Sequence, residues 1–313
     1  MPLSPSSTPA TARDWWEGAR PHTWANAFAP VIAGSGAAAA IGSFSLLRAC
    51  LAMLIAWALI VAVNFANDYS DGIRGTDDDR QGPQRLTGGG LAKPIHVKLA
   101  AFLFFGVAAL AGIILLALSG AWWMLIIGAA CIAAAWFYTG GTNPYGYRGL
   151  GEVAIFVFFG LVAVLGTQYT QAGTTTWTGL ALAMGIGGMS SAVNLANNIR
   201  DIPSDTATGK ITLAVRLGDR KARALFTYLL TLPTVLTLFI AVGSASAAMS
   251  AGEATHSGRW AAIVGLLYIP FAVKAVRTVN SGARGLDLVP VLGLTGRAML
   301  IWSILTAFSL AAF

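Results

Sequence analysis

Apolar stretches of about twenty residues recur along this chain, and they constrain its fold more than any other feature. A helix of about twenty apolar residues spans the hydrocarbon core of a bilayer. Because no water reaches backbone amides there, each stretch must satisfy its own hydrogen bonds, as a helix does. The sequence therefore predicts an all-α integral membrane protein with about nine transmembrane helices, at residues 22–43, 46–67, 97–119, 121–138, 150–170, 176–197, 222–243, 259–278 and 290–312.

The composition supports a membrane protein. Of the 313 residues, 56% are hydrophobic and 11% are charged, whereas soluble domains carry roughly 25% charged residues. The N-terminal residues lack the charged start and apolar stretch of a signal peptide. We expect residues 1–19 to form a disordered or interfacial leader, and residues 20–313 to form a single transmembrane domain.

The basic residues indicate how the chain is oriented in the membrane. If the N-terminus is cytoplasmic, all of the twenty Lys and Arg residues except Arg48 and Arg259 fall on or near the cytoplasmic side. Such a bias sets the orientation of multi-pass proteins. We expect a protein of the plasma (inner) membrane with cytoplasmic N-terminus and active-site loops. The net charge of +7 then needs no nucleic-acid partner to explain it.

Two cytoplasmic segments share one polar pattern. The sequence N-(F/L)-A-N-(D/N)-x-x-D occurs twice, each time at the end of an apolar stretch. The two copies align three residues at identical spacing, Asn64, Asn67 and Asp71 with Asn194, Asn197 and Asp201. Spacings of three and four place these groups on one helical face. Because repeats in membrane proteins often form a shared site at their interface, we expect the copies to face each other across one cavity.

The same segments contain oxygen ligands and positive charges. Carboxylates suit Mg²⁺, which binds one or two of them together with substrate phosphate oxygens. The carboxylates in question are Asp71, Asp77, Asp201 and Asp205, and the bases interleaved with them are Arg74, Arg80, Arg85, Arg200 and Lys210. Carboxylates for the metal and cations for phosphate oxygens form a diphosphate site. The sequence thus predicts a diphosphate-bearing substrate near the membrane surface.

Several nearby residues have two interpretations. Asp68 either contacts the metal or caps its helix, and Asp78 and Asp79 fit a solvated loop or a helix cap better than a metal site. Tyr138 ends the fourth stretch, where aromatic residues commonly lie at the membrane interface. Arg148 is either a positive-inside anchor or a substrate ligand.

The motifs resemble those of the UbiA superfamily of intramembrane prenyltransferases, which are NDxxD with a further Asp, and DxxxD followed by Lys. Within it, the 1,4-dihydroxy-2-naphthoate polyprenyltransferase branch of menaquinone synthesis is similar in NDYSDGIRGTD, YTGG, GLGEV and NNIRDIPSDTATGK. In the 4-hydroxybenzoate branch the last Asp of the first motif falls at the position of Gly75. Here Asp77 follows two residues later, as in the naphthoate branch. The resemblance covers nearly the whole chain.

This resemblance implies a nine-helix bundle whose central cavity is capped by cytoplasmic loops and opens sideways to lipid. The substrates would be a polyprenyl diphosphate and 1,4-dihydroxy-2-naphthoate, joined with loss of CO₂. Two Mg²⁺ ions would be held by Asp71, Asp77, Asp201 and Asp205, with Asp68 as a further candidate. The substrate contacts would come from Asn67, Arg80, Arg85, Tyr138, Arg148, Asn197, Arg200 and Lys210. Tyr138 or Tyr69 would stabilise an allylic cation through its ring face.

Three alternatives remain open from the sequence. A polytopic transporter also places polar residues at matched repeat positions, but its charges should lie near mid-membrane, where this chain has almost none. The same fold with another acceptor, such as 4-hydroxybenzoate, homogentisate, haem or chlorophyllide, is disfavoured by Asp77 and by YTGG. A lipid-linked phosphotransferase or diphosphate hydrolase would share the metal and the bases but would not need the paired motif.

Overall fold

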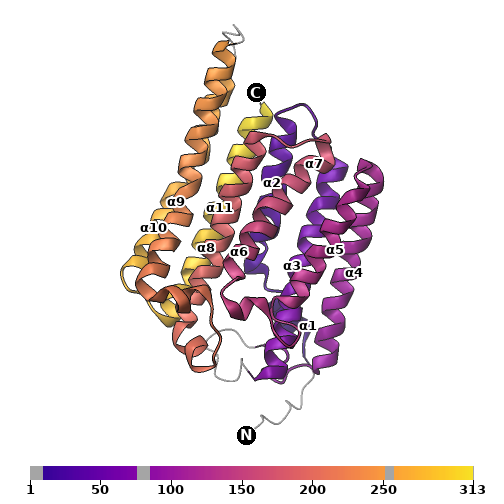
Figure 1. Ribbon diagram of the computed structural model, residues 1–313, viewed down its shortest axis with the longest axis vertical. Coiled ribbons are helices and arrows are strands. Elements are labelled where there is room, and N and C mark those ends of the chain that lie inside the picture. The colour runs from indigo at the N-terminus through magenta and orange to yellow at the C-terminus, as the bar shows by residue number, and fades with distance from the viewer. Residues whose placement is uncertain (1–9, 76–84, 251–256, 313) are drawn as a thin grey trace.

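The computed structural model describes residues 10–75, 85–250 and 257–312, and every regular element in these ranges is a helix (Figure 1). In chain order they are α1 (Ala12–Gly18), η1 (Pro21–Thr23), α2 (Ala25–Ala39), α3 (Leu46–Arg74), α4 (Pro94–Ser119), η2 (Trp122–Met124), α5 (Leu125–Phe137), η3 (Tyr145–Arg148), α6 (Gly151–Ile155), the π-helix η4 (Phe156–Leu165), α7 (Gly166–Ala172), α8 (Trp177–Ala207), α9 (Leu213–Ser250), η5 (Ser257–Tyr268), α10 (Ile269–Asn280), η6 (Gly285–Leu288) and α11 (Val289–Ala312). The predicted all-α membrane fold is confirmed.

Each of the nine predicted stretches falls on a helical segment, but they are not of equal length. In the described part of the chain, seven segments are long and apolar enough to cross a membrane. The fourth stretch is the shorter apolar segment Trp122–Phe137, and the first is α2, which has 15 residues. The protein is therefore a multi-pass membrane protein, with two helices shorter than an ordinary span.

Two helices continue well beyond their apolar stretches. α3 has 29 residues and α8 has 31, so they measure about 44 and 47 Å at 1.5 Å per residue. The hydrocarbon core is only about 30 Å thick. The C-terminal turns of both helices carry the two Asn/Asp motifs and extend past the apolar layer. They lie at the end of the bundle that also holds the N-terminus, opposite the C-terminus (Figure 1).

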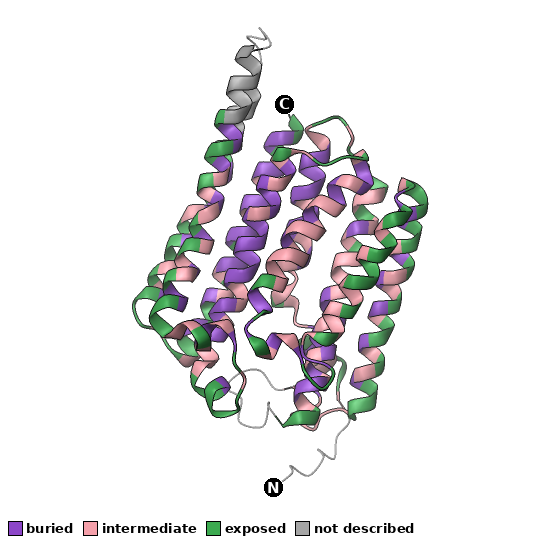
Figure 2. Cartoon of the chain, viewed as in Figure 1, coloured by how far each residue is buried: buried purple, intermediate pink, exposed green. Residues whose placement is uncertain are grey.

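α8 lies at the centre of the bundle. In its most apolar part 83% of the residues are buried, compared with 28–50% in the other six spans. It packs against α2, α9, α11 and the π-helix η4. The outer helices expose large apolar side chains such as Ile126 and Phe308, which are 77% and 72% exposed and which the bilayer would cover. Figure 2 shows buried residues on the inner helices and exposed ones on α4, α5 and α9.

The first motif ends at a glycine cap. Gly75 follows α3 with φ 73° and ψ 11°, a left-handed conformation, and its amide bonds back to the last turn. Glycine adopts this conformation without steric cost, which explains why the helix stops here. The predicted ligand Asp77, together with Asp78, Asp79 and Arg80, lies in residues 76–84, outside the described residues.

The leader is in part helical. Thr11 caps α1, and the side chain of Asp14 bonds back to the Thr11 amide at 2.7 Å. The ring of Trp15 packs edge-on against Phe65 of α3, with centroids 5.7 Å apart. Residues 12–18 thus dock onto the bundle, while the division of the chain at residue 20 stays a prediction.

Candidate active site

Tyr147 connects the ends of α3 and α8. Its hydroxyl donates to Asp71 Oδ1 at 2.5 Å. Its ring lies 5.2 Å from Lys210 Nζ and 5.7 Å from Arg74 Cζ, both in cation–π geometry. The Ile211 amide donates to the Tyr147 carbonyl at 3.1 Å. A carboxylate of the first motif and the lysine of the second therefore meet at one aromatic ring.

The carboxylates of the second motif are paired with cations. Arg200 donates two bonds of 2.7 Å to Asp201, one to each oxygen. Lys210 Nζ lies 3.5 Å from Asp205 Oδ1, and the Thr212 hydroxyl lies 3.4 Å from Asp205 Oδ2. Only 7% of the Arg200 side chain is exposed. These pairs offset the repulsion between clustered carboxylates, which is costly at a membrane boundary.

The two copies of the Asn pattern have different partners. In the first copy, the Asn64 amide donates to the Ala19 carbonyl and to the Thr23 hydroxyl, both at 3.0 Å. Asn64 thus fixes the N-terminal segment to α3. Asn67 accepts a 2.8 Å bond from the Thr139 hydroxyl, whereas the side chain of its counterpart Asn197 makes no hydrogen bond with the residues that the structure describes. The repeat therefore does not impose equal roles.

Asp68 anchors the chain where it returns from the 76–84 segment. Its carboxylate is fully buried and accepts the amides of Leu86 at 3.0 Å and Thr87 at 2.8 Å. The sequence left open a metal contact or a helix cap, and these two bonds show a third role, the anchoring of the returning backbone. A metal contact by Asp68 stays a prediction. Arg85, which is half-buried, directly precedes the anchored amides and lies at the same end of α3.

A second polar cluster surrounds Glu152 at the start of α6. It lies farther toward the membrane interior than Asp201 and Asp205. Glu152 is 4% exposed, and its Oε1 accepts bonds from Asn194 at 3.1 Å and Asn198 at 2.6 Å. The Ser191 hydroxyl donates to the Glu152 carbonyl at 2.9 Å. The Tyr138 hydroxyl donates to Asn194 Oδ1 at 3.3 Å. Asn194 of the second motif therefore joins Tyr138 to Glu152.

Arg148, another predicted substrate contact, is not joined to the carboxylates that the structure describes in the two motifs. Arg148 is exposed at the end of η3 and makes no ion pair with the described residues. Its neighbour Tyr145 donates to the Ala134 carbonyl at 2.8 Å, and burial raises the pKa of Tyr145 to about 12. Tyr145 is thus a neutral structural donor. In the described ranges no three His, Cys, Asp or Glu side chains gather closely enough to hold a metal ion.

Three site residues were missed by sequence reasoning. Tyr147 lies in a connection, and Thr139 belongs to YTGG, where the sequence indicates a role only for Tyr138. Glu152 did have a signal, because an acidic residue inside a predicted apolar stretch is expected to be functional. Glu152 lies in GLGEV, whose resemblance to the family implies no role for it by itself.

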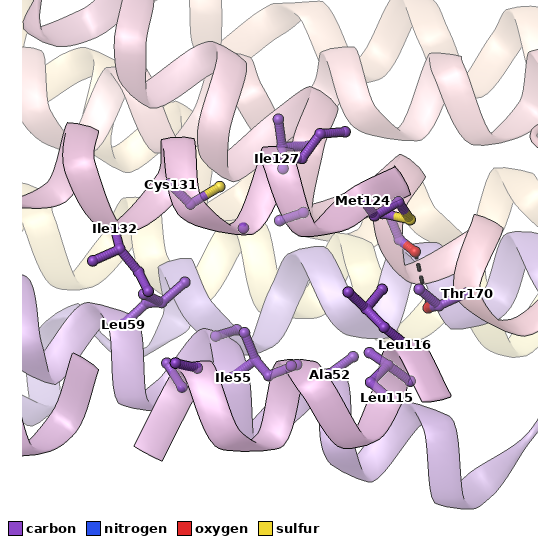
Figure 3. Close-up of a pocket in the computed structure, with 18 of the residues that line it drawn as sticks. Ala52, Ile55, Leu59, Leu115, Leu116, Met124, Ile127, Cys131, Ile132 and Thr170 are labelled. Carbon is purple, nitrogen blue, oxygen red and sulfur yellow. Dashed lines mark hydrogen bonds between the residues drawn. The ribbon is translucent and has the colours of Figure 1, made fainter. Parts of the chain in front are cut away.

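An apolar cavity of about 350 Å³ lies farther inside the bundle, between α3, α4, α5 and η4. Figure 3 shows Ile55, Leu59, Leu116, Cys131 and Ile132 around it. Leu59 lies eight residues before Asn67 on α3, about 12 Å along the helix axis. The polar ends of the motifs and this apolar space therefore follow one another along α3.

Known proteins are similar to this chain over most of its length. The chain is 51% identical to the 1,4-dihydroxy-2-naphthoate octaprenyltransferase of Mycobacterium tuberculosis, over 96% of this chain and 98% of that protein. The protein of the same name from Escherichia coli is 40% identical, over 67% of this chain and 70% of its own length.

Solved structures share the fold. A UbiA homolog from Archaeoglobus fulgidus bound to GPP and Mg²⁺ superposes with a TM-score of 0.68 at 14% identity, covering 96% of this chain and all of that chain. The apo structure of a UbiA homolog from Aeropyrum pernix gives 0.65 at 16% identity, covering 88% and 94%. The model of the UbiA prenyltransferase family matches residues 27–284. This chain belongs to the UbiA prenyltransferase family.

Proposed function

We propose that the protein transfers a polyprenyl group from a polyprenyl diphosphate to 1,4-dihydroxy-2-naphthoate, with loss of CO₂, to give demethylmenaquinol for menaquinone synthesis. The acceptor rests on the near full-length identity of 51% to a protein named for this substrate. The observation that supports a single diphosphate site most directly is that Asp71 of the first motif and Lys210 of the second both contact Tyr147.

The carboxylates at this end of the bundle fit a Mg²⁺ site. They are hard oxygen donors beside cations that suit phosphate oxygens, and a homolog of the same fold was solved with GPP and Mg²⁺. Two ions are proposed, and they would be held by Asp71, Asp77, Asp201 and Asp205. Bound Mg²⁺ supplies positive charge that stabilises the leaving diphosphate.

The protein's own cations complete the diphosphate site. Arg200 and Lys210 are paired with Asp201 and Asp205 in this structure, so each lies beside a proposed metal ligand and can turn to a phosphate oxygen when the ligand binds metal. The Tyr147 ring restrains the Lys210 ammonium. Asn67, Asn197, Arg80, Arg85 and Arg148 are proposed as further substrate contacts.

The prenyl tail would occupy the apolar cavity, because its transfer from water into apolar surroundings is favourable. Breaking the C–O bond develops positive charge on the first prenyl carbon, and the ring faces of Tyr138 and Tyr147 would stabilise that charge. The ring carbon bearing the carboxylate forms the new C–C bond. Loss of CO₂ then returns an electron pair to the ring and restores aromaticity.

The protein is proposed to lie in the plasma membrane with its N-terminus in the cytoplasm. The positive-inside bias favours this orientation, and it places both motifs on the cytoplasmic side with the water-soluble naphthoate. A single-cysteine accessibility assay at residues before α1 and after α11, in intact cells, would test it.

The reaction is tested with purified protein, Mg²⁺, geranylgeranyl diphosphate and 1,4-dihydroxy-2-naphthoate, with mass spectrometry of the product. We expect a prenylated, decarboxylated product that disappears with EDTA and returns when Mg²⁺ is added in excess. A product with 4-hydroxybenzoate or homogentisate instead would keep the reaction and reject the acceptor. No product with any aromatic acceptor would reject prenyl transfer.

A further inference from the structure

Glu152 has one buried oxygen with no hydrogen-bond partner among residues 10–75, 85–250 and 257–312. Its Oε1 is held by Asn194 and Asn198, while Oε2 is buried and receives no bond. Leaving a buried acceptor without a donor is unfavourable, and such groups in native structures need an explanation. A carboxylate fixed by one oxygen presents its other oxygen in a defined position, as a binding group for a donor on a ligand does.

The cluster lies between the diphosphate end and the apolar cavity. Asn194 precedes Asp201 by seven residues on α8, which is about 10 Å along the axis toward the membrane interior. On the antiparallel segment α6–η4, Phe158 lies six residues beyond Glu152 and lines the cavity. An aromatic acceptor attacking the first prenyl carbon must occupy this intermediate level, because that carbon joins the diphosphate to the tail.

The local backbone is shaped to bring the cluster together. A Cβ atom at Gly151 would lie 3.1 Å from the Tyr138 hydroxyl and 3.3 Å from Asn194 Nδ2. Glycine at this position therefore lets both side chains approach the first turn of α6, which contains Glu152. The 2.6 Å bond from the Asn198 amide to Glu152 Oε1 is slightly shorter than the ~2.7–2.9 Å typical of N–H donors to a carboxylate.

We propose that Glu152 Oε2 accepts the acceptor's ring hydroxyl, the one adjacent to the attacking carbon, and takes its proton during prenyl transfer. This inference rests on the proposed function. The occupant is an O–H donor on an electron-rich aromatic ring, since Oε2 offers an acceptor and lacks a donor. The other carboxylates of the site already have partners: Tyr147 for Asp71, Arg200 for Asp201 and Lys210 for Asp205. Glu152 Oε2 receives no hydrogen bond from the described residues and can therefore accept this proton.

The step balances without an external acid or base. The prenyl C–O bond breaks and diphosphate leaves. As the ring carbon that bears the carboxylate bonds to the prenyl carbon, the adjacent O–H bond breaks and its proton moves to Glu152. The oxygen becomes a carbonyl, which makes the intermediate a β-keto acid. The C–C bond to the carboxylate then breaks, CO₂ leaves, and the electron pair forms an enolate. The proton returns from Glu152 to the enolate oxygen, giving the hydroxyl of the product.

The test separates ionisation of the diphosphate from transfer to the ring. In Glu152→Gln the side chain keeps its shape and its bond to the two asparagines but cannot take a proton. We expect prenyl transfer to fall about 10²- to 10⁴-fold, as for loss of a general base. Slow Mg²⁺-dependent release of diphosphate without acceptor should stay within about twofold of wild type. Glu152→Asp, which keeps a carboxylate, should be more active than Glu152→Gln.

An acceptor with a methoxy group in place of that hydroxyl provides a second readout. Wild type should lose activity on it by a factor similar to the Glu152→Gln effect, and Glu152→Gln should show little further loss. Ser191→Ala is the matched control, because it removes only the bond to the Glu152 carbonyl and should retain transfer.

The outcomes distinguish the alternatives. Full transfer by Glu152→Gln, or an equal fall in diphosphate release and transfer, would overturn the proposal and leave Glu152 as a group that only holds α6 against α8. A wild-type enzyme inactive on every aromatic acceptor would instead reject the proposed function itself. If Glu152→Gln does not fold in detergent, the comparison of wild type on the hydroxyl and methoxy acceptors decides, and equal rates would refute the proton transfer.

Discussion

The Tyr147 hydroxyl donates to Asp71 across 2.5 Å, although the two residues are separated by 76 positions in the chain. The same ring faces Lys210, which belongs to the other motif. One tyrosine in the connection between α5 and α6 therefore sets the position of a carboxylate and of a cation. Prenyl transfer needs both groups at fixed places around the diphosphate, since positioning supplies much of such catalysis.

Replacing Tyr147 with Phe should weaken the site without removing its aromatic ring. A hydrogen bond to a charged group contributes about 1.5–3 kcal/mol, so kcat/KM for the prenyl diphosphate should fall about 10- to 100-fold. Transfer assays at varied diphosphate concentration would measure this.

The neighbouring Tyr145 provides the control for that variant. Its hydroxyl bonds to the Ala134 carbonyl rather than to a motif residue. Tyr145→Phe should keep wild-type kcat/KM and lose about 1 kcal/mol of stability. Equal kinetics for Tyr147→Phe and wild type would refute the role assigned to the Asp71 bond.

Replacing Asp201 with Asn should abolish turnover. The amide cannot supply the negative charge that the proposed Mg²⁺ site needs, and Arg200 would lose a partner that it now contacts at 2.7 Å. We expect at least a 10³-fold fall in prenyl transfer, together with the loss of acceptor-independent diphosphate release, measured by radiolabelled product and by diphosphate release. Unchanged turnover at saturating Mg²⁺ would refute the metal role of Asp201.

Asp68→Asn should affect the return of the 76–84 segment rather than the metal chemistry alone. The carboxylate accepts two amides, from Leu86 and Thr87, and the NH₂ group of Asn cannot accept the second. We expect a loss of about 1–3 kcal/mol in stability, measured as a lower midpoint of thermal unfolding in detergent. Activity that recovers fully at higher Mg²⁺, with unchanged stability, would favour a direct metal contact instead.

The apolar stretches and the matched motifs were predictable from sequence, because they are local patterns. The ends of α3 and α8 were not, since hydropathy marks where apolar side chains stop and not where helical hydrogen bonds stop. Tyr147 could not be found by spacing, because its partners come from distant segments. Asp68 shows the same limit, as the amides that it binds lie 18 and 19 residues away.

The repeat itself predicted more symmetry than the structure has. Asn64 and Asn194 occupy equal positions in the motif, but one holds the leader at Ala19 and the other joins Glu152 to Tyr138. Asn64→Ala should therefore destabilise the protein, by about 1–3 kcal/mol, and leave the acceptor's KM unchanged. Asn194→Ala should raise that KM. Thermal unfolding and acceptor titrations on both variants would show whether the effects divide in this way.

The volume of the apolar cavity should determine which prenyl chain lengths the enzyme accepts. Gly128 of α5 lines the cavity, and a Cβ atom added there meets no atom within 4 Å. The side chain in Gly128→Leu therefore starts from open space and extends into the cavity. We expect kcat/KM to fall for long-chain prenyl diphosphates and to change little for geranyl diphosphate, whose short tail needs less of the cavity. Gly112 lines the same cavity and is equally open, so Gly112→Leu should give the same ranking. A uniform loss across all chain lengths in both variants would place the tail elsewhere.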